Sequence, residues 1–149
     1  MSILLSRSEA HSLIWNALTG SGTSPENADY FTQAILDTEL SGLEGHGFYW
    51  LQDYCEHLRS GKVDGRAVPQ IESVSETSFR VDAQHGFAHP AIEAGFKYLI
   101  PAAKAHGVAA MGVYNSYNAA TLGFHTGYLA RAGLLALGAT NAVPNLAPV

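Results

Sequence analysis

The spacing of hydrophobic residues changes near residue 66, and this change limits the folds that are available to the chain. Before that point, apolar residues such as Ile14, Ala17 and Leu18 recur three or four positions apart, which is the period of an amphipathic helix. After it, short alternating runs interleave with helical runs. The pattern predicts a helical segment over residues 1–66 and an α/β segment over residues 67–149.

Capping residues predict where the first two helices begin. Ser6 and Glu9 have the spacing of a capping box, in which the two side chains each pair with a backbone N–H at the start of a helix. Ser24 followed by Pro25 marks the second start, because proline is favoured in the first helical turn. Each of these two helices is expected to end at the next glycine along the chain.

A third helix is predicted from Phe48 to Leu58, where apolar residues repeat after three, four and three positions. Gly61 then supplies a left-handed stop. Cys55 is the single cysteine and lies on the apolar stripe of this helix, so we expect a buried structural thiol and no internal disulfide.

Beyond residue 66 the chain alternates between strand and helix patterns. Two short strands are predicted on either side of a Ser-Glu-Thr-Ser turn, followed by a helix, a strand, a helix and a last strand. The expected bounds are 71–74 and 79–81, then 90–106, 108–114, 119–131 and 134–140. Strands that alternate with helices favour parallel pairing through crossover helices. The expected fold class is therefore α/β, with a three-helix segment followed by a mixed sheet.

The distribution of charge argues against two classes of partner. The formal net charge is −5 and the eight basic residues are scattered singly, so no basic stripe is available to bind nucleic acid. No apolar run approaches the roughly 20 residues that span a bilayer, and the first residues lack a signal-peptide pattern, which favours a cytoplasmic protein. Only 14% of the residues are charged, so we expect an apolar part of the surface to contact a partner, as in a homo-oligomer such as a dimer.

The first candidate for chemistry is the glycine-rich segment 42–47, which contains His46. Its glycines allow the backbone to pass close to a substrate, and they place an imidazole at the start of a helix. Such an imidazole could donate a proton to the oxygen or nitrogen of a substrate. The alternative is that His46 only caps the helix and that the glycines only make a turn.

The second candidate is the strand-to-helix junction 115–122. Small and amide side chains follow a predicted parallel strand at the N-terminus of a helix, where an anion or a cofactor phosphate can bind. The alternative is an ordinary Asn/Ser capping turn, because the chain has no G-x-G-x-x-G fingerprint here.

Two further groups of residues are interpreted as structural. His85 and His89 are four positions apart, but Gly86 and Pro90 disfavour a helix that would present both rings, and no Cys, Asp or Glu stands at ligand spacing. We therefore expect no metal site. The aromatic residues from Phe48 to Tyr54, which include Trp50, are expected to serve core and interface packing, with a substrate cage as the alternative.

Several of these features in register resemble the malate/L-lactate dehydrogenase family of type 2, over its N-terminal half. This family includes Δ1-pyrroline-2-carboxylate reductases, ureidoglycolate dehydrogenases and sulfolactate dehydrogenases. The features that carry the resemblance are Gly45-His46-Gly47, the helix end at 58–61, Val81-Asp82-Ala83 with Gly86, the Asn115-Ser116 junction and the strand end at Thr140-Asn141.

The resemblance implies a nicotinamide-dependent dehydrogenase fold that is not a Rossmann fold. His46 takes the position of the family's proton donor. The stretch formed by Asn118, Ala119, Ala120, Thr121 and Leu122 takes the position of a loop that contacts the cofactor, with Asn118 in place of a histidine of many members. The implied function is hydride transfer between NAD(P)H and a small 2-oxo or 2-hydroxy acid or a cyclic 2-imino acid, with His46 as the proton donor.

Two residues beside His46 depart from the family pattern at positions expected to contact the substrate. Gly45 replaces a serine, and Trp50 replaces an arginine that binds the substrate carboxylate. The family also continues for about as many residues again, so the sequence resembles a truncated copy whose partner is a missing C-terminal half. The alternative function is a non-catalytic remnant that binds a ligand or associates with itself.

Overall fold

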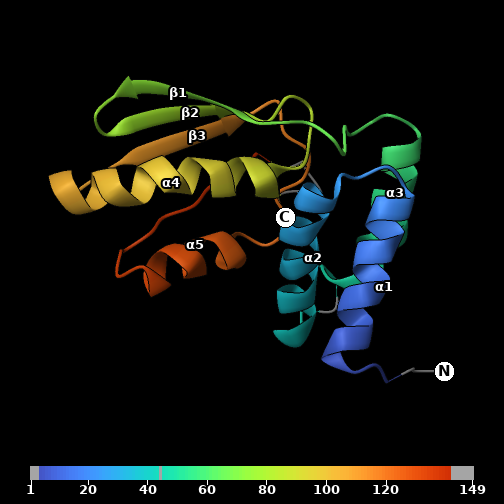
Figure 1. Ribbon diagram of the computed structural model, residues 1–149. Coiled ribbons are helices and arrows are strands. Elements are labelled where there is room, and N and C mark those ends of the chain that lie inside the picture. The colour runs from blue at the N-terminus through green and yellow to red at the C-terminus, as the bar shows by residue number, and fades with distance from the viewer. Residues whose placement is uncertain (1–3, 44, 142–149) are drawn as a thin grey trace, which may run out of the picture.

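Three helices pack side by side in the N-terminal part of the computed structural model, which describes residues 4–43 and 45–141 (Figure 1). They are α1 (Arg7–Gly20), α2 (Pro25–Leu40) and α3 (Leu51–Arg59), and a short 3-10 helix, η1 (Phe48–Trp50), precedes α3. The capping box at the start of α1 is confirmed, since the Ser6 N–H donates to the Glu9 carboxylate over 2.8 Å and the Ser6 hydroxyl accepts from the Glu9 N–H. At the start of α2, the Ser24 hydroxyl accepts from the Asn27 N–H.

Phe31 of α2 lies at the centre of the helical core and is fully buried. Its ring centroid lies 4.8 Å from that of Tyr54 on α3 and 4.3 Å from that of Phe87, which stands just before the fourth helix. Cys55 is 5% exposed and its thiol donates to the Ala17 carbonyl, which confirms the expected buried thiol. The helical core thus takes in a residue from the α/β part of the chain.

The sheet has three strands in the order β1-β2-β3 and is mixed, as expected. β1 (Gln70–Ser75) pairs antiparallel with β2 (Ser78–Asp82), and β2 pairs parallel with β3 (Ala110–Tyr114). The connection from β2 to β3 is the crossover helix α4 (Ala88–His106). The predicted parallel pair with a helix between its strands is therefore confirmed.

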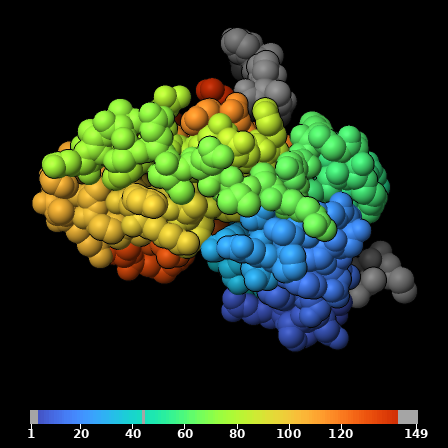
Figure 2. Space-filling model, turned by 45° about the horizontal axis from the view of Figure 1, so that its top comes forward, coloured from blue at the N-terminus to red at the C-terminus, as the bar shows by residue number. Residues whose placement is uncertain are grey.

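One face of the sheet packs against α4 (Figure 1). Val81 is fully buried there, and Gly95 brings α4 so close that an added Cβ would lie 2.1 Å from the Met111 sulfur. The helix continues through Pro101 to His106, and Gly107, whose φ is +83°, caps its end. In Figure 2, the blue N-terminal helices and the sheet with α4 form two adjacent masses with an indentation between them.

The last two predicted elements need correction. The final helix, α5, runs from Leu122 to Arg131 rather than from residue 119, because Ala120 has a φ of +50° that a right-handed helix excludes. The predicted strand at 134–140 is wrong, since this segment has no regular secondary structure and Leu135 and Leu137 are fully exposed. Alternating apolar residues do not make a strand unless the backbone pairs with a neighbour, and within the described residues this segment forms no ladder with β3.

Among the described residues, none of the helices combines the length and the apolar character that crossing a lipid bilayer requires.

A buried polar side chain, that of Asn27, holds the connection between the helical part and the sheet. The Asn27 amide donates to the carbonyls of Gly65 and Ala67, each over 3.0 Å, and Asn27 is 7% exposed.

We predict that Asn27→Ala lowers the free energy of unfolding by about 2–3 kcal/mol, because two buried carbonyl groups lose their donor. Urea denaturation followed by circular dichroism measures this change. Asn16→Ala is the matched control, since Asn16 is exposed on α1, and we expect it to stay within about 0.5 kcal/mol of the unchanged chain. Equal effects of the two substitutions would contradict the assigned role of Asn27.

Candidate functional site

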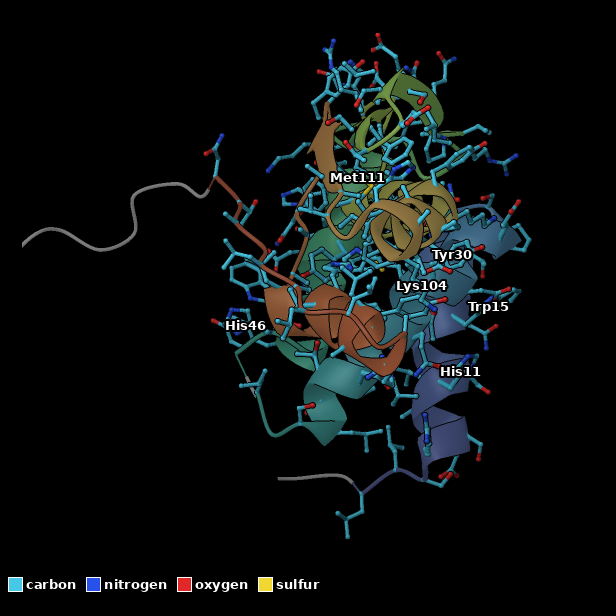
Figure 3. The ribbon with its side chains drawn as sticks, turned by 90° about the vertical axis from the view of Figure 1, so that its left-hand side faces the viewer. His11, Trp15, Tyr30, His46, Lys104 and Met111 are labelled. Atoms are coloured by element: carbon cyan, nitrogen blue, oxygen red, sulfur yellow. The ribbon has the colours of Figure 1, made fainter. Side chains whose placement is uncertain are left out.

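His46 lies in the turn that connects α2 to η1, and its side chain is exposed. Its backbone N–H donates to the Leu43 carbonyl over 2.9 Å, and the Trp50 indole N–H donates to the Gly45 carbonyl over 2.8 Å. In the view of Figure 3, His46 lies on the opposite side of the molecule from His11 and Trp15 of α1. Glu44, which belongs to the same glycine-rich segment, lies outside the described residues.

Glu39, in the last turn of α2, holds this turn in place. Its Oε2 accepts the Phe48 N–H over 3.0 Å. Gly47 is buried against the same carboxylate, because a Cβ at this position would lie 1.9 Å from Oε2. Glu39 was not predicted from the sequence, although an acidic residue in the last turn of a helix is unfavourable next to the negative end of the helix dipole and indicates a partner elsewhere.

The junction between β3 and α5 is an irregular segment whose backbone is held by local side chains. Asn115 and Ala120 have φ values of +49° and +50°, in the left-handed region. The Asn118 side-chain oxygen accepts the Ala120 N–H over 2.7 Å, and the Asn115 amide donates to the Asp82 carboxylate. The backbone N–H of His85 also donates to the Asn115 carbonyl over 2.8 Å, so the segments that follow β2 and β3 are bonded to each other.

Thr121 is the residue that precedes α5, and its hydroxyl makes no cap to the helix. It lies instead 3.1 Å from the hydroxyl of Thr38, which is buried in the last turn of α2. Thr38 and Glu39 are neighbours in sequence, and they contact the Thr121 junction and the His46 turn respectively. The fold therefore brings the two predicted site segments to the same end of α2.

The five residues from Asn118 to Leu122 are placed in different surroundings. Ala119 and Leu122 line a groove of about 370 Å³ between α4, β3, α5 and segment 134–140. His46, Gly45 and Trp50 do not contribute to this groove. Trp50 is 40% exposed beside the ring of Tyr49, whereas Tyr54 is in the core, so the aromatic stretch divides between surface and core.

Tyr117 ties the same junction to α3, which the sequence analysis did not predict. Its hydroxyl contacts Nδ1 of His57, and the Lys62 ammonium lies 3.1 Å from Nε2 of the same ring. Because an ammonium can only donate, Nε2 accepts and the Nδ1 proton is donated to the Tyr117 oxygen. Burial raises the pKa of Tyr54 to about 12, and burial with the nearby Asp53 carboxylate raises the pKa of Tyr117, so both phenols stay protonated at neutral pH.

The two histidines of segment 85–89 do not share a site. His85 is exposed in a turn, whereas His89 is 2% exposed in the first turn of α4. Among the described residues, no three His, Cys, Asp or Glu side chains are grouped so that they could hold a metal ion.

A protein family and several individual proteins of known sequence are similar to this chain. Residues 5–149 match the family described as malate/L-lactate dehydrogenase. The chain is 38% identical over 127 residues to a Δ1-pyrroline-2-carboxylate/Δ1-piperideine-2-carboxylate reductase of Pseudomonas syringae pv. tomato, and the aligned region covers 85% of this chain and 37% of that protein. It is 37% identical over 148 residues to a (2R)-3-sulfolactate dehydrogenase (NADP(+)) of Chromohalobacter salexigens, and the aligned region covers 99% of this chain and 44% of that protein.

Solved structures agree in fold. The Δ1-piperideine-2-carboxylate reductase from Pseudomonas syringae superposes with a TM-score of 0.85 at 34% identity, over 89% of this chain and 40% of that chain. A malate dehydrogenase from Entamoeba histolytica superposes with a TM-score of 0.83 at 24% identity, over 89% of this chain and 37% of that chain, and this likeness concerns the fold alone. The chain thus spans less than half the length of these relatives. With residues 5–149 matched throughout, the chain belongs to the malate/L-lactate dehydrogenase family.

Proposed function

We propose that this chain contributes the proton donor and part of the cofactor site of an NAD(P)H-dependent oxidoreductase. The proposed substrates are small 2-oxo or 2-hydroxy acids, or cyclic 2-imino acids of the Δ1-pyrroline-2-carboxylate type. The observation that carries the proposal is the attachment of the His46 turn and the Asn118–Leu122 segment to adjacent residues of α2, Glu39 and Thr38.

The N-terminus of α5 fits the phosphates of a nicotinamide cofactor. Thr121 leaves the first N–H groups of this helix without a side-chain cap, and open space lies beside Gly123. Uncapped helical N–H groups favour an anion. We assign Asn118, Ala119, Ala120, Thr121 and Leu122 as cofactor contacts. The cofactor, when bound, supplies the hydride, which is chemistry that the side chains cannot supply.

His46 is assigned as the residue that gives a proton to the substrate oxygen or nitrogen. Its exposed position allows a small acid to approach, and the Glu39 contacts limit the motion of its turn. Gly45 and Trp50 are assigned as substrate contacts because the hydrogen bond from the Trp50 indole N–H to the Gly45 carbonyl holds both residues beside His46. An indole offers a flat apolar face to a cyclic imino acid, whereas it gives no bidentate contact to a carboxylate.

A second candidate function is a non-catalytic protein that associates with another polypeptide or with itself. Leu135 and Leu137 favour it, because both are fully exposed at the edge of the 370 Å³ groove. The division into a helical segment at 1–66 and an α/β segment at 67–149 also remains our proposal.

We predict that NADPH or NADH binds the 149-residue chain and that His46→Ala lowers kcat/KM for reduction of Δ1-pyrroline-2-carboxylate by about 10²–10⁴-fold without changing cofactor affinity. Nicotinamide fluorescence measures binding, and loss of absorbance measures turnover. His11→Ala, on the opposite side of the molecule, is the control. Absence of cofactor binding at millimolar NADPH and NADH would reject the proposed cofactor site and favour the non-catalytic alternative.

Asn118→Asp is expected to weaken cofactor binding about tenfold, since it sets a negative charge beside a phosphate. Aspartate keeps the oxygen that accepts the Ala120 N–H, so the backbone of the junction is preserved. The loss should shrink at high salt, which screens exposed charges. Asn16→Asp adds the same charge on α1 and should leave affinity unchanged; an equal loss in both variants would argue against a phosphate at Asn118.

Glu39 is expected to act as a positioning residue for His46. Gly47→Ala should cost about 1–2 kcal/mol of stability, because its methyl group displaces the carboxylate that binds the Phe48 N–H. Glu39→Ala removes the same hydrogen bond, so the double variant should cost about 1 kcal/mol less than the sum of the single ones.

The kinetic signature of this positioning role is a fall in kcat with KM nearly unchanged in Glu39→Ala. Glu39→Gln keeps an acceptor oxygen and should restore most of the activity. Additive stability effects, or an equal loss of activity in Glu39→Gln, would show that Glu39 does not act through the turn.

A further inference from the structure

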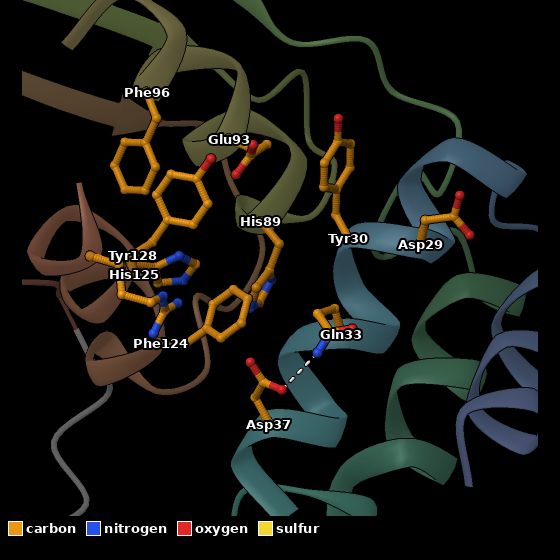
Figure 4. A pocket seen from close by; sticks show the side chains of 11 residues that line it. Asp29, Tyr30, Gln33, Asp37, His89, Glu93, Phe96, Phe124, His125 and Tyr128 are labelled. Atoms are coloured by element: carbon orange, nitrogen blue, oxygen red, sulfur yellow. Dashed lines mark hydrogen bonds between the residues drawn. The ribbon is translucent and has the colours of Figure 1, made fainter. Parts of the chain in front are cut away.

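His89 is a buried histidine whose ring has no hydrogen-bond partner. It is 2% exposed, and among the described residues neither ring nitrogen has a partner. An unpaired buried polar group of this kind is costly, and native proteins pair the great majority of them. The ring faces a cavity of about 400 Å³ between α2, α4 and α5 (Figure 4). The missing partner is therefore expected in this cavity.

The histidines of the cavity offer hydrogen-bond acceptors. Burial holds the pKa of His89 well below its usual range and also lowers the pKa of His125, whose ring centroid lies 5.0 Å away, so both rings are neutral at neutral pH. Nε2 of His125 lies 3.1 Å from the Ala119 carbonyl, which can only accept, so Nε2 carries the proton and Nδ1 keeps a lone pair. A neutral His89 holds another lone pair on one ring nitrogen and an N–H on the other, and neither has a partner among the described residues. The two lone pairs of His89 and His125 can accept hydrogen bonds from a ligand that donates them.

The charges around the cavity favour a cation. Its lining contains the carboxylates of Asp29, Asp37 and Glu93 and the exposed guanidinium of Arg131. Asp29 accepts the Trp15 indole N–H and Asp37 accepts the Gln33 amide, while Glu93 has no hydrogen bond or ion pair with another described residue. Glu93 stands four residues after His89, which places both on one face of α4.

Aromatic rings complete the lining. Phe124 lies 6.2 Å from the His89 ring, and Phe96 of α4 stacks on Tyr128 of α5 with centroids 5.5 Å apart. Figure 4 shows these rings around the space that His89 enters. Aromatic faces attract organic cations and also contact apolar rings. This combination of rings, lone pairs and a free carboxylate is suited to an amine that carries a hydrocarbon ring.

We propose that the cavity between α2, α4 and α5 binds a small primary ammonium compound with an apolar ring. The ammonium group donates to His89 and His125 and pairs with Glu93, while the ring packs against Phe124 and Tyr128. None of the residues assigned to the dehydrogenase site lines this cavity, so the proposal does not depend on the proposed function.

The test compares two probes of nearly equal shape, protonated benzylamine and benzyl alcohol, added to the 149-residue chain at pH 7. Isothermal titration calorimetry gives the two dissociation constants, and ¹⁵N NMR follows the ring nitrogens of His89. We expect benzylamine to bind about tenfold more tightly and to shift the His89 resonances. Equal affinities, or no binding of benzylamine at tens of millimolar, would overturn the proposal.

Variants separate the ammonium contact from the general charge of the protein. Glu93→Gln keeps the shape of the side chain, and we expect it to remove most of the tenfold preference for benzylamine. Glu76→Gln, in the exposed turn between β1 and β2, makes the same change in charge outside the cavity and should leave the preference intact. An unchanged preference in Glu93→Gln, with the fold confirmed by circular dichroism, would also overturn the proposal.

Discussion

The last turn of α2 is the constraint on which the candidate site depends. Thr38 and Glu39 contact different segments: the Thr38 hydroxyl is hydrogen-bonded to that of Thr121, and the Glu39 carboxylate accepts the Phe48 N–H. This last turn of α2 is held in place because buried residues earlier in the helix, such as Phe31 and Ile35, pack in the helical core. A rigid helix end is thus used to place two loops that are about 75 residues apart in sequence.

The same helix joins the two halves of the molecule. Phe31 contacts Tyr54 on α3, and it also contacts Phe87 and His89 at the start of α4. The rings of Phe87 and Tyr54 in turn flank Tyr117, which lies in the junction between β3 and α5 just before the candidate cofactor segment. A continuous aromatic cluster therefore connects the helical core to the junction after β3.

The parts of the fold that the sequence predicted were those encoded by neighbouring residues. The Ser6 capping box, the Gly61 stop and the turn between β1 and β2 depend on contacts within a few positions, so their patterns can be recognised without a structure. The hydrogen bond between His57 and Tyr117 joins residues 60 positions apart, and no periodic pattern in the sequence indicates it. The error at 134–140 has a related cause, because alternation records which side chains are apolar but not whether a backbone partner is present.

The two segments of the candidate site could be picked out from the sequence for the same reason, whereas their roles stay predictions. Glycines around His46 and small residues after β3 marked both segments, whereas the contacts of Glu39 and Thr38 that hold them arise only when α2 is placed. The backbone at the ends of β2 and β3 adds a mechanical consequence. His85 and Asn115 both adopt left-handed backbone conformations, which are unfavourable for a residue other than glycine, and a backbone hydrogen bond joins the two residues. Neither loop can relax alone, so the two strand exits should shift as a single stiff body whenever one of them is displaced.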